Sequence, residues 1–131
     1  MKLNPEFFES LVSIIGGGIV VAKPSGETIY VNPAMHGMLG YEEGEMIGMF
    51  VKDFTDPSDI QSTIDTIQES IKKPGYEVQL EKFYLKQNGE RFYGLTTIKS
   101  QIVNGELLLF ASISDFVDQY MSRQHVEKQY K

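Results

Sequence analysis

Two Asn-Gly pairs in the C-terminal half constrain the fold of this chain more than any other feature. Asn88-Gly89 and Asn104-Gly105 are typical of two-residue type I′ turns, because such turns need positive φ at both central positions. They separate three long segments that are rich in β-branched and aromatic residues, at 76–87, 90–103 and 106–114. These segments are predicted to form an antiparallel meander.

Two-residue loops at both turns would fix the register of this meander. Leu85 would then pair with Phe92, and Ile98 with Ala111. One face would carry Phe83, Leu85, Phe92, Ile98, Ile102, Leu107, Leu109, Ala111 and Ile113, with the polar residues Gln79, Glu81 and Thr96. The other face would carry Val78, Leu80, Tyr84, Tyr93, Leu95, Leu108 and Phe110. Both faces are too apolar to contact water directly, so each needs a cover.

The N-terminal half predicts three helices and one hairpin. Residues 19–22 and 28–31 flank a Pro-Ser-Gly turn and predict the hairpin. Asn32-Pro33 and Asp56-Pro57 are cap-plus-proline starts of helices, and Gly40 ends the first of these. The second of these helices has an apolar stripe of Ile60, Ile64, Ile67 and Ile71. A preceding helix over residues 5–15 has a stripe of Phe7, Phe8, Leu11, Val12 and Ile15.

Length and composition indicate one ordinary globular domain. The chain has 131 residues, of which 41% are hydrophobic and 23% charged, which suffices for one core. A net charge of −6 argues against nucleic-acid binding, which needs a basic face. We expect a cytoplasmic domain without membrane contact, because no apolar run is long enough to span a bilayer and the N-terminus lacks the apolar core of a signal peptide.

Catalytic and metal chemistry find no support in the sequence. The chain contains no cysteine, which excludes disulfides, thiolate metal sites and a cysteine nucleophile. No nucleophile–base set, metal-ligand spacing or phosphate loop is present. The acidic residues Asp53, Asp56 and Asp59 are explained by a helix start, where negative charge is favourable. We therefore expect no catalytic residues, no metal site and no enzymatic activity.

The chain resembles the PAS domain family over about residues 18–118. The resemblance rests on four stretches in order: IVVAKPSGETIYVNPA at 19–34, MLGY at 38–41 followed by EMIG at 45–48, KQNG at 86–89, and SISDFV at 112–117. It implies an α+β fold with a five-stranded antiparallel sheet of order 2-1-5-4-3 and helices over one face. Three parts are then expected: an N-terminal flanking helix at 1–16, the PAS core at 17–115 and an exit helix at 116–131.

The resemblance also implies a sensory or input domain of a signalling protein, such as a histidine kinase, a cyclic-dinucleotide enzyme, a chemoreceptor or a transcription regulator. A small ligand or a partner contact would act on an output domain through the exit helix, with Asp115 coupling the sheet to that helix. The expected cavity residues are Met35, Met38, Leu39, Phe50, Phe54, Ile64, Ile67, Phe83, Leu85, Gly94, Ile98, Leu109, Ala111 and Ile113. Candidate polar contacts to a ligand are Asn32, Gln79, Glu81 and Thr96.

Simpler interpretations stay open beside these assignments. Asn32 would serve only as a helix cap, the methionines only as core filling, Glu81 as a solvated side chain and Asp115 as a local cap. The whole domain could also be a ligand-free dimerisation module, which a filled core would favour. A small stand-alone α+β enzyme is the weakest alternative, and turnover of a substrate would be needed to support it.

No cofactor is expected, although an unidentified small ligand stays open. Covalent flavin photochemistry needs a cysteine, and Ile113 stands where flavin-binding relatives place a polar amide. Haem-binding relatives place their ligand on the long helix, but residues 57–73 contain no histidine, so haem bound through His36 is not expected. As partners we expect an output domain or kinase and a second copy of the chain. The apolar stripe of residues 5–15 would pack on Val78, Leu80, Leu95, Leu108 and Phe110, or would help the second copy to cover them.

Overall fold

The computed structural model describes residues 6, 10 and 17–115. The elements are β1 (Gly18–Ala22), β2 (Thr28–Val31), α2 (Pro33–Leu39), the 3-10 helices η1 (Val51–Phe54) and η2 (Pro57–Asp59), α3 (Ile60–Lys72), β3 (Glu77–Leu85), β4 (Arg91–Val103) and β5 (Glu106–Asp115). The exit helix predicted at 116–131 lies outside the described residues, and so does the N-terminal apolar stripe of Phe7, Phe8, Leu11, Val12 and Ile15.

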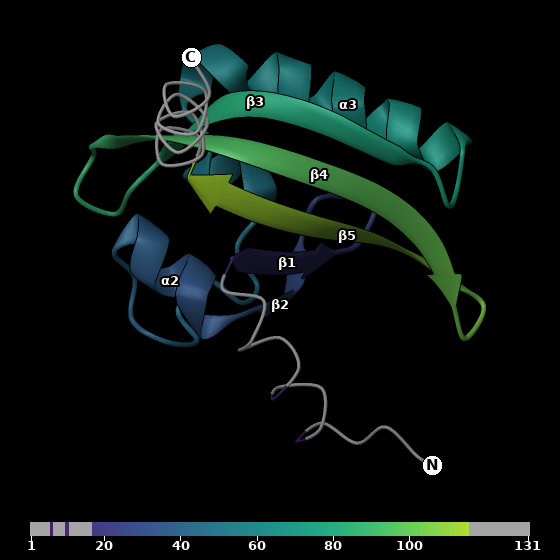
Figure 1. Ribbon diagram of the computed structural model, residues 1–131, viewed down its shortest axis with the longest axis horizontal. Helices are drawn as coiled ribbons and strands as arrows, with labels where there is room; N and C mark the ends of the chain where they lie inside the picture. The colour runs from purple at the N-terminus through teal and green to yellow at the C-terminus, as the bar shows by residue number, and fades with distance from the viewer. Residues whose placement is uncertain (1–5, 7–9, 11–16, 116–131) are drawn as a thin grey trace, which may run out of the picture.

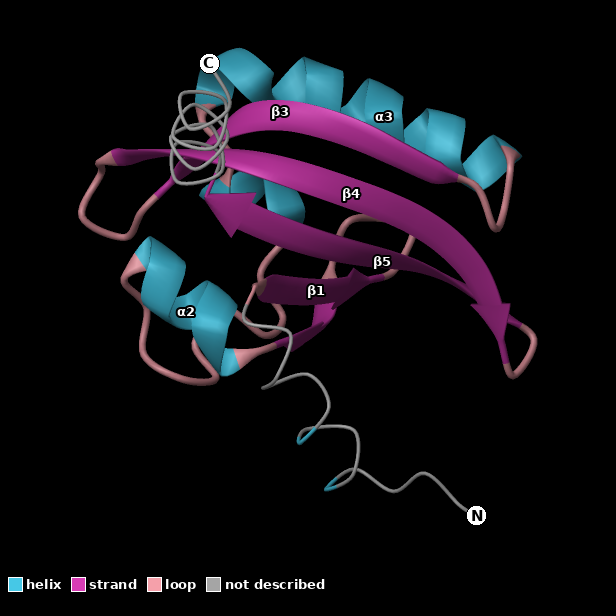
Figure 2. Ribbon diagram, viewed as in Figure 1, coloured by secondary structure: helices cyan, strands magenta, loops and turns pink. Residues whose placement is uncertain are grey.

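The five strands form one antiparallel sheet in the order β2-β1-β5-β4-β3 (Figure 1), which confirms the predicted topology. In Figure 2 the helix α3 runs alongside β3, and α2 lies close to β1. The core lies between these helical elements and one face of the sheet, which we call the inner face. Among the described residues, no helix is long and apolar enough to cross a membrane.

Asn32 caps α2 and also ties that helix to the sheet. Its side-chain oxygen accepts hydrogen bonds from the backbone N–H of Met35 (3.0 Å) and of Ile19 (2.8 Å). Its side-chain nitrogen donates to the carbonyl oxygen of Gly17 (3.0 Å). The capping interpretation of Asn32 is therefore confirmed, and Gly40 ends the helix with a φ of 78° as its sequence position predicts.

The second predicted turn is confirmed, whereas the first has a different length. Asn104 and Gly105 have φ values of 52° and 79°, and Val103 pairs with Glu106 across a two-residue turn. At the first turn the N–H of Lys86 instead donates to the carbonyl oxygen of Glu90 (2.8 Å), which leaves a three-residue loop. In that loop only Gly89 has positive φ (90°). Leu85 consequently pairs with Arg91, one residue away from the predicted register.

The one-residue shift moves every side chain of β3 to the opposite face. Tyr84 pairs with Phe92 and Lys82 with Gly94, so these side chains lie on the inner face. The prediction was therefore wrong for all of β3. Gln79, Glu81, Phe83 and Leu85 lie on the outer face, and Val78, Leu80 and Tyr84 on the inner face. The predicted faces of β4 and β5 are right, because their shared register is set by the second turn.

The long helix α3 presents a mixed polar and apolar surface to the sheet. Thr63 and Ser70 are its buried residues, and Ile67 lies half-buried between them. Ile64, which was predicted to be buried, is 43% exposed. The hydroxyl of Ser100 on β4 donates to the carbonyl oxygen of Ser70 (2.6 Å), which helps to hold the helix in this rotation.

Truncation of two isoleucines on α3 is expected to have unequal effects on stability. Ile67→Ala removes a side chain that packs beneath the helix and should cost about 2 kcal/mol, at the low end for such truncations because Ile67 is only half-buried. Ile64→Ala should cost less than about 1 kcal/mol, because that side chain is largely exposed. Urea unfolding of both variants measures the difference. Equal losses would contradict the rotation of the helix described above.

Candidate functional site

A small cavity lies beneath α3, against the inner face of the sheet. Its volume is about 40 Å³, which gives room for about three water molecules and is far below the usual size of a cofactor pocket. Its wall consists of Val20, Ala22, Val51, Phe54, Thr63, Ile67, Lys82, Tyr84, Thr96, Ile98, Leu109, Ala111 and Ile113. Most of this wall is aliphatic, so the few polar groups in it stand out as candidate ligand contacts.

Lys82 brings a charged group into this cavity wall. The residue is only 2% exposed, although lysines are almost never buried without a partner of opposite charge. Its Nζ donates hydrogen bonds to the side-chain oxygens of Thr55 (3.0 Å) and Thr63 (3.2 Å). It also lies 4.4 Å from the centre of the Tyr84 ring, within range of a cation–π contact. Two threonines and a tyrosine thus surround the ammonium group.

Within the part of the chain that the structure describes, Lys82 forms no ion pair. Burial favours its neutral form and lowers the pKa of Lys82 to about 7, while the negative charge of Asp59 acts in the opposite direction. The amine of Lys82 can therefore change its charge near neutral pH, depending on the groups that contact it in the cavity.

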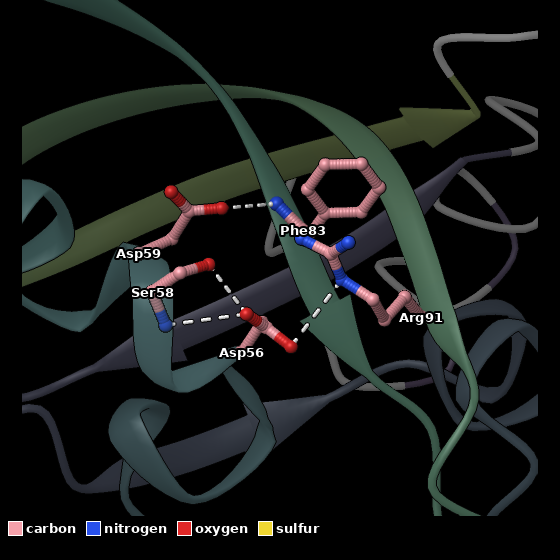
Figure 3. A network of polar contacts seen from close by, with 5 residues as sticks. All are labelled: Asp56, Ser58, Asp59, Phe83 and Arg91. Carbon is pink, nitrogen blue, oxygen red and sulfur yellow. Dashed lines mark hydrogen bonds and ion pairs between the residues drawn. The ribbon is translucent and has the colours of Figure 1, made fainter.

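The segment from Thr55 to Asp59 fixes the part of β3 that carries Lys82. The Asp59 carboxylate accepts the backbone N–H of Phe83 at 2.7 Å (Figure 3). The N–H of Asp56 donates to the Phe83 carbonyl (3.0 Å). The guanidinium of Arg91 stacks on the Phe83 ring at 3.7 Å and pairs with Asp56 at 3.4 Å. Because the Phe83 backbone is held on the edge of the sheet, the neighbouring Lys82 side chain is directed inward.

Asp56 joins this network to the start of α3. Its carboxylate accepts the backbone N–H of Ser58 (3.2 Å), as the cap-plus-proline pattern predicts, and it also accepts the Ser58 hydroxyl. The hydrogen bond from that hydroxyl, assisted by the charge of Arg91, holds the pKa of Asp56 below its usual value. Asp56 is therefore a helix cap and an anchor for β3.

Tyr84 and Thr96 form the second polar group of the cavity. Their hydroxyls share one hydrogen bond, and burial raises the pKa of the Tyr84 phenol. The ring lies over Gly94, where an added Cβ would come within 2.9 Å of the ring and 3.2 Å of Ile113. The Tyr84 ring can therefore pack over Gly94 only because this residue has no side chain.

Seven of the residues predicted for a ligand site line this cavity: Phe54, Ile67, Thr96, Ile98, Leu109, Ala111 and Ile113. Met35, Met38 and Leu39 instead pack into the core, and Gly94 lies beneath Tyr84. Phe83, Leu85, Gln79 and Glu81 lie on the outer face because of the register shift, so their assignment to the cavity was wrong. Glu81 is exposed and accepts a hydrogen bond from the Tyr93 hydroxyl (3.0 Å), in keeping with the solvated interpretation.

The most unusual residue of the cavity, Lys82, was missed by sequence reasoning. The only signal is its place in the alternation Leu80, Lys82, Tyr84, where a charged residue interrupts an apolar series. Thr63 was missed for a related reason: the isoleucine stripe predicted that the neighbouring face of α3 would be buried.

A surface groove lies on the other side of part of the cavity wall. It has a volume of about 410 Å³ and runs between the turn of the first hairpin, the segment 50–52 and the start of α3. Phe50 and Ile64, two of the residues predicted for the cavity, line this groove instead. Val51, Thr63 and Ile67 line both spaces and therefore separate the cavity from the groove.

His36 is part of the protein framework. Its Nδ1 lies 3.0 Å from the carbonyl oxygen of Asn32, and its Nε2 accepts the backbone N–H groups of Gly44 (3.1 Å) and Met46 (3.0 Å). Acceptance at Nε2 requires the proton to be on Nδ1, so both ring nitrogens are engaged. The described residues contain no cluster of three or more histidine or acidic side chains that could hold a metal ion.

A family model for the PAS domain matches residues 16–115. The structure is similar to the PAS domain of an HTR-like protein from Haloarcula marismortui, with a TM-score of 0.70, 21% identity and coverage of 85% of this chain and 90% of that one. It is also similar to a PAS domain from a two-component sensor histidine kinase, with a TM-score of 0.70, 14% identity and coverage of 84% of this chain and 94% of that one.

A third similar structure is the PAS domain of nitrogen regulation protein NR(II) from Vibrio parahaemolyticus, with a TM-score of 0.68, 9% identity and coverage of 82% of this chain and 96% of that one. No curated protein sequence matches the chain. The similar structures share the fold of this chain. The match to the family model covers all five strands and the helices α2 and α3. The chain therefore belongs to the PAS domain family.

Proposed function

We propose that this chain is a cytoplasmic sensory domain of a signal-transduction protein, without catalysis of its own. A small ligand in the Lys82 cavity would shift the domain between two arrangements, and residues 116–131 would carry the change to an output domain or kinase. Two of the similar solved structures come from proteins described as a sensor histidine kinase and a nitrogen regulation protein, which supports a signalling role.

The observation that carries this proposal is the course of β5. Leu109, Ala111 and Ile113 of this strand line the cavity, and the strand ends at Asp115, directly before residues 116–131. Asp115 pairs with Gly94, which in turn lies beneath the Tyr84 ring of the cavity wall. A ligand that displaces the cavity wall would therefore act on the strand that leads to the output domain.

A hybrid kinase tests this coupling. Residues 1–131 replace the sensory domain of a histidine kinase, and the rate of autophosphorylation is measured. Ala111→Leu adds bulk to the cavity wall and should change this rate about fivefold or more, as expected for coupled sites. Ser112→Ala, the next residue on the exposed outer face, is the matched control and should keep the parent rate. The same rate in the parent and both variants would contradict the proposed coupling.

A dimerisation role is the second candidate function, and the outer face of the sheet favours it. Phe110 and Leu108 lie on this face of β5, and Leu95 lies on the same face of β4, farther along the sheet and opposite Ser114. The prediction that Val78 and Leu80 also belong to it was wrong, because both lie on the inner face. We propose that a second copy of the chain packs across this face of β4 and β5 and covers all three residues. Light scattering of Leu95→Glu should then report a monomer where the parent protein is a dimer, and a parent monomer would exclude this role.

A further inference from the structure

The polar groups of the cavity offer hydrogen-bond donors without matching acceptors. The Thr55 hydroxyl donates its own hydrogen to the carbonyl of Val51 (2.8 Å), and the Thr63 hydroxyl donates to that of Asp59 (2.7 Å). Both threonine oxygens therefore act as acceptors for Lys82 and use two of the three hydrogens of its ammonium group. The third ammonium hydrogen has no such acceptor in the described structure.

The pair formed by Tyr84 and Thr96 has the same excess of donors. The two hydroxyls carry two hydrogens, and their mutual hydrogen bond uses one of them. Whichever hydroxyl donates, the other keeps a hydrogen for a further acceptor. Both residues line the cavity together with Lys82, and no acidic side chain belongs to its wall. A ligand that completes this site must bring acceptor atoms and a negative charge.

We infer that the Lys82 cavity binds a monocarboxylate of the size of acetate, as the ligand of the sensory function proposed above. One carboxylate oxygen accepts from the Lys82 ammonium and the other from the hydroxyl pair of Tyr84 and Thr96. The hydrocarbon end lies against the aliphatic wall of β1 and β5. A volume of about 40 Å³ limits the ligand to this size, and the aliphatic wall disfavours a wholly polar anion.

The groove next to the cavity gives this inference a size-dependent test. Val51, Thr63 and Ile67 separate the two spaces, and Ile67 has the largest side chain of the three. Ile67→Ala should open the cavity toward the groove of about 410 Å³. The variant should then accept longer chains such as butyrate and valerate, which the parent protein excludes.

Binding should also depend on the protonation of Lys82. Asp59 of η2 is the charged group whose field reaches Lys82, and Tyr84 is the other titratable side chain in the cavity wall. The parts of β1, α3, β4 and β5 that line the cavity are uncharged. Because the ammonium form pairs with the carboxylate, the affinity for acetate should fall about tenfold for each unit that the pH rises above about 7.

The experiment is an NMR titration of the full chain with sodium acetate, against sodium chloride at equal ionic strength. Acetate should shift the backbone amide signals of Lys82, Thr96 and Ile113 in the parent protein and in Lys99→Met, which removes a lysine from the other face of β4. The shifts should be lost in Lys82→Met, and acetamide, which is neutral, should cause none. Absence of acetate shifts in the parent protein, or equal shifts in Lys82→Met, would overturn the inference.

The outcomes also separate this inference from the proposed sensory function. If acetate does not bind but Ala111→Leu changes the output of the hybrid kinase, the ligand class is wrong and the sensory role stands. If acetate binds with the expected Lys82 dependence but neither acetate nor Ala111→Leu changes the output, the binding site stands and the sensory role fails.

Discussion

Lys82→Met is expected to stabilise the protein at pH 6 and to lose most of that advantage by pH 10. At pH 6 the parent protein must bury the ammonium of Lys82 without an ion-pair partner, whereas methionine fills the same space without that cost. Thr55 and Thr63 still donate their hydroxyl hydrogens to backbone carbonyls in the variant, so the substitution leaves no buried donor without a partner there.

The sign of the pH effect follows from the two pKa values of Lys82. In the folded protein the pKa is about 7, and in the unfolded chain it is about 10.4. Between these values the unfolded chain binds more protons, so the free energy of unfolding of the parent protein rises with pH. A difference of about 3.4 units at about 1.4 kcal/mol each gives a gain of about 5 kcal/mol over the full titration, of which about 4 kcal/mol falls between about pH 6 and pH 10. The variant lacks this gain, because methionine does not titrate.

Urea unfolding from pH 6 to pH 10 measures this effect as the difference between the parent protein and Lys82→Met, in which the contributions of all other groups cancel. Lys99→Met is the matched control and should keep the pH dependence of the parent protein, because Lys82 is intact in it. A difference between the parent protein and Lys82→Met that does not change with pH would show that Lys82 reaches solvent in the folded state.

Asn32→Ala is expected to destabilise the protein by about 3 kcal/mol, because three buried or half-buried backbone groups lose their partner at once. The N–H groups of Ile19 and Met35 and the carbonyl of Gly17 would all be left without the Asn32 amide. Asn32→Asp should have a smaller effect, because it keeps the acceptor for both N–H groups and loses only the donor to Gly17.

Urea unfolding of these variants, with Asn88→Ala as the matched control, tests the role of Asn32. Asn88 lies in an exposed turn and its side chain accepts one hydrogen bond, from the N–H of Glu90 (2.9 Å), so its removal should cost less than about 1 kcal/mol. Similar losses in Asn32→Ala and Asn88→Ala would mean that the Asn32 amide acts only as an ordinary helix cap.

Turn chemistry predicted the meander of β3, β4 and β5 but determined its register at only one of the two turns. At Asn104-Gly105 both residues adopt positive φ, so the rule for two-residue turns holds. At Asn88-Gly89 the asparagine side chain accepts the N–H of Glu90 and only the glycine adopts positive φ, which makes a longer loop. The dipeptide is compatible with either loop, and a difference of one residue is enough to turn β3 over.

That single shift also explains why the polar part of the candidate site could not be predicted. With β3 turned over, Lys82 and Tyr84 appeared on the outer face, and Gln79 and Glu81 took their place in the expected cavity. The residues from β4 and β5, including Thr96 and Ile113, were predicted correctly because the second turn sets their register. The buried position of Lys82 depends on Thr55, Thr63 and the anchor of β3 at Asp59, which are contacts between segments distant in sequence.

Periodicity located α3 but not its exact rotation about its axis. Thr63, Ile67 and Ser70 follow one another at spacings of four and three and face the sheet, because Lys82 and Ser100 offer polar partners there. Ile64 belongs to the same apolar stripe in the sequence but borders the surface groove. An apolar stripe defines a helix face only approximately, so buried polar partners on the sheet decided which residues became buried.

The most direct test of the buried Lys82 site is an NMR titration of the lysine side chain in the free protein. With lysine labelled at Cε and Nζ, the Lys82 signal is assigned by its absence in Lys82→Met and followed as the pH is raised. A midpoint near pH 7 is expected, as for an ammonium group enclosed by Thr55, Thr63 and Tyr84 without an ion-pair partner. A midpoint near about 10.4, the ordinary value for lysine, would contradict the account.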